Sequence, residues 1–261
     1  MTAVRIRIQH NSMQFSDDRD QHAHDAKVVF DFATNNDVWA VTGTESGSSP
    51  SNHDLRQLLI DQAHAHNWFG YFHKWGDWVA LNRRFLHRFD HGYMGPFIPG
   101  THGLSPAQGA HSPRGITWAQ GEAKSANLGL MTFGAAHYLT AGSMKVSGSN
   151  QRLVNGIGKY GHEHGGGKKL VFFDADANEH DDQVDVFRGK PFTTIADELH
   201  KHPKTHGKDK QHGSAIDIIS SYDHDGRVTG KSYRVLDDSD LHLYADHFLL
   251  LADYNVREMA V

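Results

Sequence analysis

An aspartate–histidine pair, Asp246-His247, stands directly before the apolar run 248–251. Polar residues at this position are unfavourable unless they act at the edge of the strand. A histidine that is oriented by a carboxylate is a suitable acid/base group for phosphoryl chemistry. Asp217 lies inside a second apolar run, 216–219, where an unpaired carboxylate would be costly to bury. We therefore expect His247 to pair with Asp217, and a structural buried pair is the alternative.

Asp176 and Asn178 follow the apolar segment 169–173. In an extended strand, residues two apart leave the same face, about 7 Å from one another along the chain. A carboxylate and an amide so placed could orient a water molecule and an anionic oxygen. The alternative is a turn, because Asp-x-Asn is common turn chemistry.

Three further polar residues end predicted strands: Asn11, Glu45 and His137. Hard cations such as Mg²⁺ bind through one or two carboxylates, water and substrate phosphate, so a single Glu45 can suffice. A solvated glutamate in a loop is the alternative for Glu45, and a structural histidine is the alternative for His137. Asn11 is uninformative by itself.

Three His-x-His pairs suggest a different metal site. The first two fall in predicted helices, where residues two apart do not share a face, and no His-Glu-x-x-His motif occurs. A zinc site is therefore disfavoured at each of these pairs, which are His22/His24, His64/His66 and His162/His164.

Composition limits the class of protein. The chain has 261 residues, no cysteine and a net charge of −5, so disulfides and thiolate–metal sites are excluded. No apolar run is long enough to span a bilayer and no signal peptide is evident, so we expect a cytoplasmic protein without stable membrane association. The negative charge argues against a broad basic surface for nucleic acid, but permits transient contact with a phosphate backbone. The segment 201–210 is the only local basic run.

Periodicity predicts more strands than helices, and no linker divides the chain, so we expect one domain over 1–261 with two packed sheets and outer helices. We expect an irregular loop or lid at 88–116 and a hairpin turn at 223–226. Strands are expected at 4–11, 37–43, 68–73, 77–84, 115–120, 127–138, 169–173, 215–220 and 248–254, and helices at 20–34, 51–63 and 153–160.

Taken in order, these motifs resemble the endonuclease/exonuclease/phosphatase superfamily, which has the deoxyribonuclease I-like fold. The resemblance extends from residue 4 to 256, and the chain departs from the family pattern at His10, Ala175, Ala177 and Ala245. The matching positions are Asn11, Thr44-Glu45-Ser46, His137, Asp176-Ala177-Asn178, Asp217 and Asp246-His247.

The resemblance implies an α+β fold, a four-layer α/β/β/α sandwich with two central, mainly antiparallel sheets. It also implies a divalent cation, Mg²⁺ or Mn²⁺, at Glu45, with Asn11 and Asp246 nearby. Asp176 and Asn178 would orient the attacking water and the phosphoryl oxygen.

By the same resemblance, His247, paired with Asp217, would bind or protonate the phosphate. His137 would be the second acid/base group, with Asp77 as its expected carboxylate partner. All eight site residues should line one polar cleft, flanked by 88–116 and 201–210.

The expected function is that of a divalent-metal-dependent phosphodiesterase, a nuclease with DNA as the favoured substrate. The alternatives are a phosphatase or lipid phosphodiesterase on the same fold, and a non-catalytic structural or binding protein. Fold alone does not choose between them. The sequence leaves open the natural substrate, the strand preference and the oligomeric state.

Overall fold

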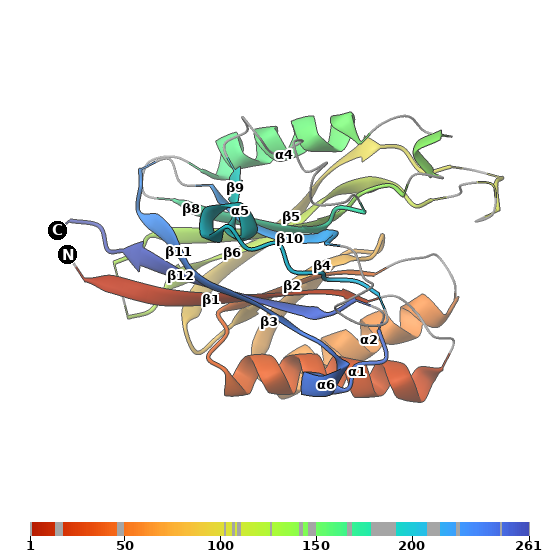
Figure 1. Cartoon of the computed structure of the whole chain (residues 1–261), viewed down its shortest axis with the longest axis horizontal. Helices are drawn as coiled ribbons and strands as arrows, with labels where there is room; N and C mark the ends of the chain where they lie inside the picture. Colours follow the sequence, from red (N-terminus) through yellow and green to blue (C-terminus); the bar gives the residue numbers. More distant parts are fainter. Residues whose placement is uncertain are drawn as a thin grey trace.

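The computed structural model forms two six-stranded sheets that pack face to face (Figure 1). Sheet A has the strand order β11-β12-β1-β2-β4-β3, and sheet B has the order β5-β6-β7-β8-β10-β9. The structure describes residues 2–13, 18–45, 50–101, 103–105, 108, 111–125, 127–140, 143–145, 150–165, 169–178, 192–207, 215–222, 225–245 and 247–260, without the side chains of 45, 50–54, 238 and 239.

Most strands pair antiparallel with their neighbours, and each sheet contains one parallel pair, β1 with β2 and β7 with β8. The strands are β1 (Ala3–Met13), β2 (Ala40–Glu45), β3 (Trp68–Phe72), β4 (Asp77–Asn82), β5 (Leu86–Ile98), β6 (Arg114–Ala123), β7 (Leu130–His137), β8 (Leu170–Asp176), β9 (Phe192–Thr194), β10 (Asp217–Tyr222), β11 (Val228–Leu236) and β12 (Leu249–Arg257). The helices are α1 (Arg19–Asn35), α2 (Pro50–Ala65), α4 (Gln151–His164), α5 (Ile195–Leu199) and α6 (Asp238–Leu241).

Three apolar layers hold the molecule together. Helices α1 and α2 cover the outer face of sheet A, and α4 covers the outer face of sheet B (Figure 1). The central layer lies between the sheets, where Ile6 and Ile8 of β1 join Phe133 of β7 and Phe172 of β8. The fold is therefore the expected four-layer α/β/β/α sandwich.

Strand alternation decides which polar residues share the inner faces, because side chains two apart leave a strand on the same side. In β1, Ile6 and Ile8 face the central layer, so His10 and Ser12 follow them on that side. In β8, Asp174 and Asp176 follow the inner residue Phe172 in the same way. The inner faces are thus apolar in the middle and polar at one end.

Strand direction brings the polar ends together. The parallel pairs place the C-terminal ends of β1 and β2, and those of β7 and β8, side by side. Strands β4, β6, β10 and β12 run antiparallel to these neighbours, so their N-terminal ends lie at the same rim. We call this rim the polar end of the sandwich.

The expected loop at 88–116 is too long, because about half of this segment is strand and only 99–113 lies between strands. Strand β5 extends to Ile98 and β6 begins at Arg114. β5 is the edge strand of sheet B, and most of its side chains are only partly buried or exposed. An edge strand tolerates Gly92, Gly95 and Pro96, which obscured the alternation in the sequence.

The expected hairpin at 223–226 is also wrong. The flanking strands belong to different sheets, β10 to sheet B and β11 to sheet A, so the segment crosses between sheets. Asp223 and His224 lie outside the described residues. The Asp-Gly signal marked a connection between two strands, and the described residues 225 and 226 form a bend, but the two strands are not partners.

A charged cluster on sheet A joins three strands. Asp253 of β12 is buried, and its carboxylate accepts hydrogen bonds from Arg7 Nε at 2.7 Å, from Ser232 Oγ at 2.5 Å and from Arg5. Burial alone would raise the pKa of Asp253, but these donors hold it below its usual range. The carboxylate therefore stabilises the fold above its unfolded-state pKa, and this stabilisation is lost as the pH falls.

Replacing Asp253 with alanine should lower the free energy of unfolding by about 3 kcal/mol at pH 7, because it leaves the part-buried guanidinium of Arg7 without its partner. Urea unfolding of both proteins measures the difference, and Asp61→Ala, at an exposed position of α2, is the control. The difference should shrink as the pH is lowered below 4, as expected for a depressed carboxyl pKa. Equal stabilities of the Asp253→Ala and wild-type proteins at pH 7 would contradict this.

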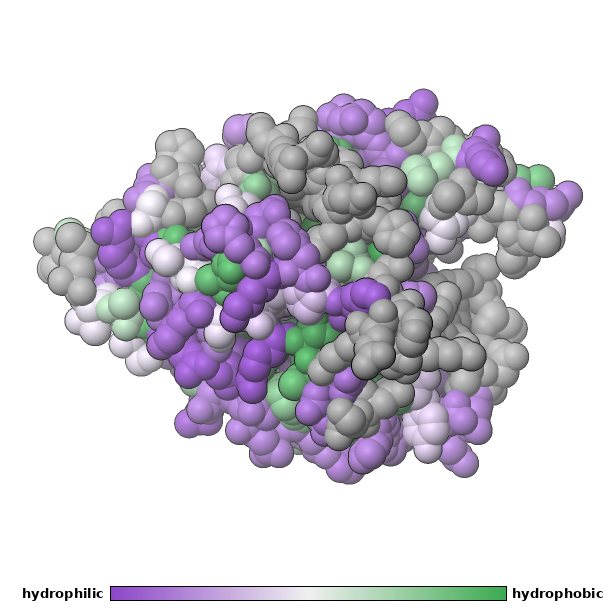
Figure 2. Space-filling model, in the orientation of Figure 1, coloured by the Kyte–Doolittle hydropathy of each residue, from purple (hydrophilic) through white to green (hydrophobic). Residues whose placement is uncertain are grey.

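In the part of the chain that the structure describes, no helix has both the length and the apolar character needed to cross a membrane. On the face drawn in Figure 2, most of the coloured surface is hydrophilic, with a small hydrophobic area near the middle.

Candidate active site

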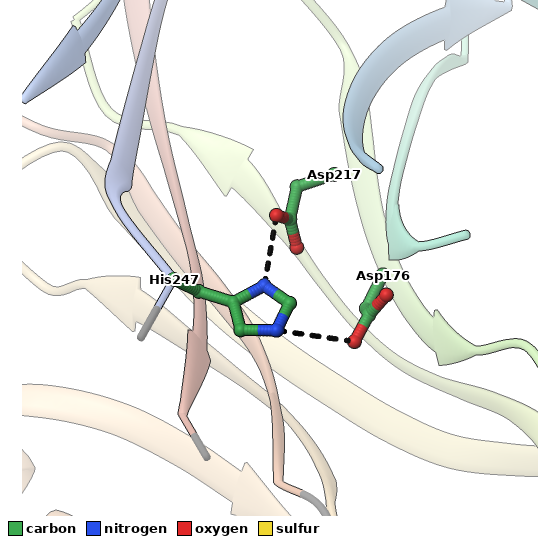
Figure 3. Close-up of side chains that lie close together, drawn as sticks. All are labelled: Asp176, Asp217 and His247. Atoms are coloured by element: carbon green, nitrogen blue, oxygen red, sulfur yellow. Dashed lines mark hydrogen bonds and ion pairs between the residues drawn. The ribbon is translucent and has the colours of Figure 1, made fainter. Parts of the chain in front are cut away.

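An aspartate–histidine pair forms the centre of the polar end (Figure 3). His247 Nδ1 lies 2.9 Å from Asp217 Oδ2, and both residues are about 95% buried. The expected contact between them is confirmed. His247 precedes β12 in sheet A and Asp217 begins β10 in sheet B, so the pair links the two sheets.

The surroundings keep Asp217 ionised. Burial alone would raise the pKa of Asp217, but the imidazoles of His247 and His10 outweigh it and hold the pKa below the usual range. Ser12 Oγ donates to Asp217 Oδ1 at 2.5 Å. The backbone amides of Ile216 and Asp217 each donate to Thr205 Oγ1 at 3.0 Å, which fixes the start of β10.

Asp176, the last residue of β8, lies between two histidines. Its Oδ2 is 3.8 Å from His247 Nε2 and 3.3 Å from His137 Nε2, and His137 ends the neighbouring strand β7. Burial raises the pKa of Asp176 to about 7, and the nearby charge of Asp217 adds to this, partly offset by His247. This carboxyl group can therefore exchange a proton near neutral pH. We call Asp176, Asp217, His247 and His137 the Asp–His cluster.

Asn178 adopts a left-handed backbone conformation, with φ 51°, which asparagine tolerates better than most residues. Its backbone amide donates to Asp176 Oδ1 at 3.0 Å, and its side-chain Nδ2 donates to the carbonyl of Tyr138 at 3.0 Å. Asn178 thus holds Asp176 in place and lies beside the cluster. The turn predicted as the alternative is also present, because the Asp176–Asn178 contact is an Asx-type turn.

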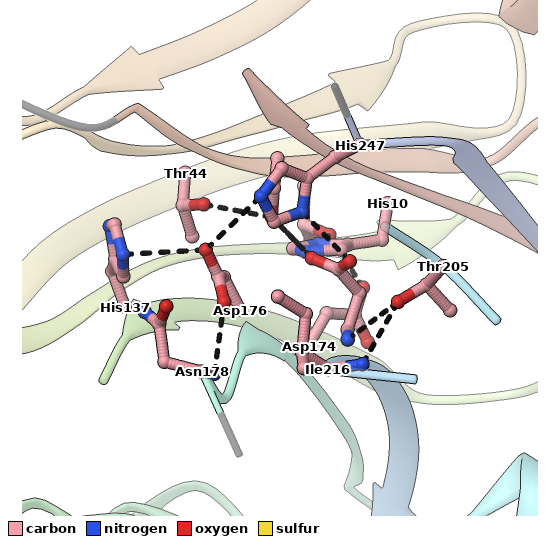
Figure 4. Close-up of polar contacts among 12 residues, drawn as sticks. His10, Thr44, His137, Asp174, Asp176, Asn178, Thr205, Ile216 and His247 are labelled. Atoms are coloured by element: carbon pink, nitrogen blue, oxygen red, sulfur yellow. Dashed lines mark hydrogen bonds and ion pairs between the residues drawn. The ribbon is translucent and has the colours of Figure 1, made fainter. Parts of the chain in front are cut away.

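A hydrogen-bonded network behind the cluster was missed by the sequence reasoning (Figure 4). His10 Nδ1 is 3.0 Å from Thr42 Oγ1, and His10 Nε2 is 3.2 Å from Ser12 Oγ. Thr42 Oγ1 donates to Asp174 Oδ2 at 2.6 Å, and Thr44 Oγ1 donates to Ser12 Oγ at 3.0 Å. The network orients Asp217 from the side opposite His247.

Asn11 does not join the cluster. Its Oδ1 accepts a hydrogen bond from Gln9 Nε2 at 2.9 Å, and the same nitrogen lies 3.2 Å from the carbonyl of Val29 in α1. Alternation along β1 sends Gln9 and Asn11 toward the helix layer, and His10 and Ser12 toward the Asp–His cluster. The expected role of Asn11 beside a cation there conflicts with this placement.

The side chains of two expected metal ligands, Glu45 and Asp246, are not among those that the structure describes. Glu45 is the last residue of β2, next to Thr44, but its side chain is not among those described; Asp246 lies outside the described residues. Asp77 was the expected carboxylate partner of His137. The carboxylate within ion-pair distance of His137 is that of Asp176 instead. Asp77 begins β4 opposite Thr44, at the same end of the sandwich.

The segment 201–210 does reach the site in its described part. Thr205 bonds to the start of β10, and the ring of His206 lies 4.6 Å from that of His247, centroid to centroid. Backbone pairing between His206 and His247 holds this segment against the cluster. Lys208 and Lys210 fall outside the described residues.

Asp176, Asp217 and His247 are also the group that could hold a metal ion, since their ligand atoms lie within 4.8 Å of one another. Within the described ranges, none of the three His-x-His pairs belongs to such a group. The donors are two carboxylates and one imidazole, a set that suits a divalent cation.

No protein-family model and no curated protein matches the chain by sequence. Solved structures do match over nearly the whole length. An endonuclease/exonuclease/phosphatase family protein from Bacteroides thetaiotaomicron is 14% identical, with a TM-score of 0.72 over 98% of this chain and 96% of that one.

Two further matches have described activities or ligands. The mannosyl-6-phosphatase Bt3783 of B. thetaiotaomicron is 13% identical, with a TM-score of 0.69 over 95% of this chain and 99% of that one. D. rerio TDP2, complexed with a single-strand DNA product, is 12% identical, with a TM-score of 0.66 over 97% of this chain and 99% of that one. The fold is therefore that of the endonuclease/exonuclease/phosphatase superfamily, as the motifs implied, while the reaction has to be argued from the side chains.

Proposed function

We propose that the chain is a divalent-metal-dependent phosphodiesterase that hydrolyses nucleic acid, with DNA favoured. One observation carries the proposal: two carboxylates and two imidazoles are buried together at the polar end of this fold, with His247 bridging Asp217 and Asp176. Buried titratable groups that perturb one another are typical of hydrolytic sites. A structural ion pair would need Asp217 and His247 but not the additional Asp176–His137 contact.

Each member of the cluster has a role that its contacts support. The ionised Asp217 accepts the Nδ1 proton of His247 and so directs Nε2 toward Asp176 and the substrate. From there, Nε2 protonates the departing oxygen or binds a phosphoryl oxygen. Asp176, with a pKa of about 7, takes a proton from the attacking water. His137, 3.3 Å from Asp176 Oδ2, is the second acid/base group.

A divalent cation fits the donors present. Asp176 would hold it, with Glu45 and Asp246 as the further candidate ligands, and His247 and Asp217 would keep their acid/base roles. When bound, it would neutralise the charge of the phosphate and lower the pKa of a coordinated water. Mg²⁺ and Mn²⁺ are the proposed ions, because carboxylates dominate this donor set.

A row of aromatic side chains supports nucleic acid as the substrate. These rings occupy alternate positions at the facing edges of the two sheets, and Lys74 and Arg83 each lie 5.0 Å from a ring centroid. Aromatic rings flanked by cations are what proteins use to bind single strands without sequence preference. The similar fold of D. rerio TDP2 also holds a single-strand DNA product. The row consists of Phe69, Tyr71, His73, Trp75, Phe89, His91 and Tyr93.

A phosphatase is the second candidate, favoured by the similar fold of the mannosyl-6-phosphatase. Single-stranded DNA, RNA and p-nitrophenyl phosphate, tested in parallel, separate the two candidates. We expect cleavage of the polynucleotide at a kcat/KM well above that for the monoester. A preference for the monoester would show that the protein is a phosphatase and not a nuclease.

Chelation should abolish hydrolysis, and Mg²⁺ or Mn²⁺ should restore it. The same ions should raise the thermal unfolding midpoint of the chelator-treated protein, because a ligand that binds only the folded state stabilises it. Asp176→Asn should lose most of this shift. Undiminished activity in excess chelator, or tight stoichiometric zinc in the purified protein, would contradict the proposed cation.

A further inference from the structure

A buried aspartate stands on the inward face of helix α1. The buried positions of this helix recur three and four residues apart, and Asp25 is one of them, with only 5% of its surface exposed. Val29 and Phe30 on the same face pack into the outer apolar layer of sheet A. A carboxylate on an apolar face is costly to bury unless hydrogen bonds satisfy it. Asp25 finds these bonds in the segment that leads into Asp246-His247.

Both oxygens of Asp25 accept hydrogen bonds from the backbone of that segment. The amide of Tyr244 lies 3.0 Å from Oδ1 and 3.1 Å from Oδ2, and the amide of Ala245 donates to Oδ2 at 2.9 Å. A carboxylate offers two acceptor oxygens in a fixed plane, so it can hold two neighbouring amides at once. One side chain of α1 therefore fixes two consecutive peptide units.

Neighbouring contacts dock the same segment on α1. Leu243 is 7% exposed and belongs to the apolar layer beneath α1 and α2. His24 Nδ1 lies 3.2 Å from Asp25 Oδ1, and the rings of His24 and Tyr244 meet edge to face with 5.2 Å between their centroids. Residues 243–245 are thus held on the helix by an apolar contact, a ring contact and the backbone hydrogen bonds to Asp25.

A second anchor holds the chain on the other side of the imidazole. The backbone of His247 pairs with that of His206, and the amide of Phe248 donates to the carbonyl of Thr205 at 2.7 Å. The bonds to Asp25 supply the anchor on the N-terminal side, where they end two residues before His247. The backbone at His247 is therefore held from both directions.

The imidazole of His247 has to satisfy two distances at once. Its Nδ1 lies 2.9 Å from Asp217 Oδ2, while its Nε2 faces Asp176. A displacement of about 1 Å at a reacting group can cost on the order of 10²-fold in rate. We propose that Asp25 is a positioning residue, which keeps His247 in this orientation by holding the backbone just before it. This role rests on the proposed phosphodiesterase function and deepens it, because it extends the support of the site to the helix layer.

Kinetics of Asp25→Ala on single-stranded DNA test the positioning role. The variant should lower kcat by at least about 10-fold, the scale on which support for an active-site group is lost. KM should stay within a few-fold of wild type, because the groups that bind substrate remain. Asp25→Asn keeps one acceptor oxygen and should give an intermediate kcat. If Asp25→Ala fails to fold, Asp25→Asn carries the test.

Asp31→Ala, on the same helix, is the matched control. Asp31 pairs with His66 Nε2 at 2.8 Å and with Lys27, so its loss also weakens the packing of α1, but not through residues 243–245. This variant should keep the wild-type kcat. An equal loss of kcat in Asp25→Ala and Asp31→Ala would assign the effect to general destabilisation of α1 and overturn the positioning role.

Proton NMR of the metal-free protein gives a readout that needs no turnover. The proton on His247 Nδ1, hydrogen-bonded to Asp217, should give a far-downfield signal, which its loss in His247→Asn assigns. Asp25→Ala should shift or broaden this signal, and Asp31→Ala should leave it unchanged. An unchanged signal together with an unchanged kcat in both Asp25 variants would overturn the proposal. A changed signal in a protein without hydrolytic activity would support the positioning role and refute the proposed function.

Discussion

Replacing His247 with asparagine is expected to lower the rate of phosphodiester hydrolysis by on the order of 10²-fold or more, the usual scale for a lost general acid or base. The asparagine amide can still donate to Asp217 Oδ2, so the buried carboxylate keeps a partner. The ring Nε2, which faces Asp176, is removed. Steady-state kinetics should therefore show a fall in kcat in a protein that remains folded.

Chemical rescue makes this result specific. His247→Ala leaves a space in the shape of the ring, and added imidazole should restore part of its activity. His64→Asn, at an exposed position of α2, is the matched control and should keep the wild-type rate. A rate within a few-fold of wild type for His247→Asn would remove His247 from the mechanism.

Replacing Asp176 with asparagine should have two opposite effects. Hydrolysis should fall by on the order of 10²-fold or more, because the group that accepts the proton from water is lost. Stability should rise at pH 8, since burial raises the pKa of Asp176 to about 7 and its ionisation opposes folding. Each unit of pKa difference is worth on the order of 1.4 kcal/mol.

The sign of the pH dependence follows from the raised pKa. The wild-type protein has the full benefit of the protonated carboxyl below the unfolded-state pKa and loses it as the pH rises toward 7. The stability advantage of Asp176→Asn should therefore be present at pH 8 and disappear near pH 4. Urea unfolding at both pH values measures it, with the exposed Asp61→Asn as the control. A variant that is less stable at pH 8 would contradict the raised pKa.

The pairing of Asp217 with His247 could be predicted from the sequence for a physical reason. A carboxylate inside the apolar run 216–219 needs a partner, and the histidine before the last apolar strand could supply one. The inner-face positions of His137 and Asp176 also follow from the apolar residues that precede them on alternate positions. Local burial patterns were thus enough to predict the positions of Asp217, His137 and Asp176 in the site.

Asn11 shows where family motifs and alternation disagree. Ile6 and Ile8 face the central layer, so alternation along β1 already indicated His10 and Ser12 as the inward residues. The resemblance favoured Asn11 instead. In β2 the same reasoning was not available, because Val38, Trp39, Ala40 and Val41 are apolar on both faces and reveal no alternation. Thr42 was therefore missed, and Thr44 was named only as part of the motif Thr44-Glu45-Ser46.

Other features could not be read from local sequence at all. The sequence of residues 223–226 predicts a turn, but only tertiary packing decides that β10 and β11 join different sheets. Arg114 is one arginine at the start of a strand, and nothing in its sequence context shows that it is almost fully buried. Such properties depend on residues far away along the chain.

The role of the Asp–His cluster as a hydrolytic site is tested most directly by the rate of single-stranded DNA cleavage in Mn²⁺, measured for wild-type and Asp176→Asn proteins purified in the same way. We expect cleavage by the wild type and a loss of on the order of 10²-fold or more in the variant. Equal rates would show that any cleavage comes from elsewhere, and no cleavage of DNA or of any phosphoester by the wild type would contradict the proposed hydrolytic role.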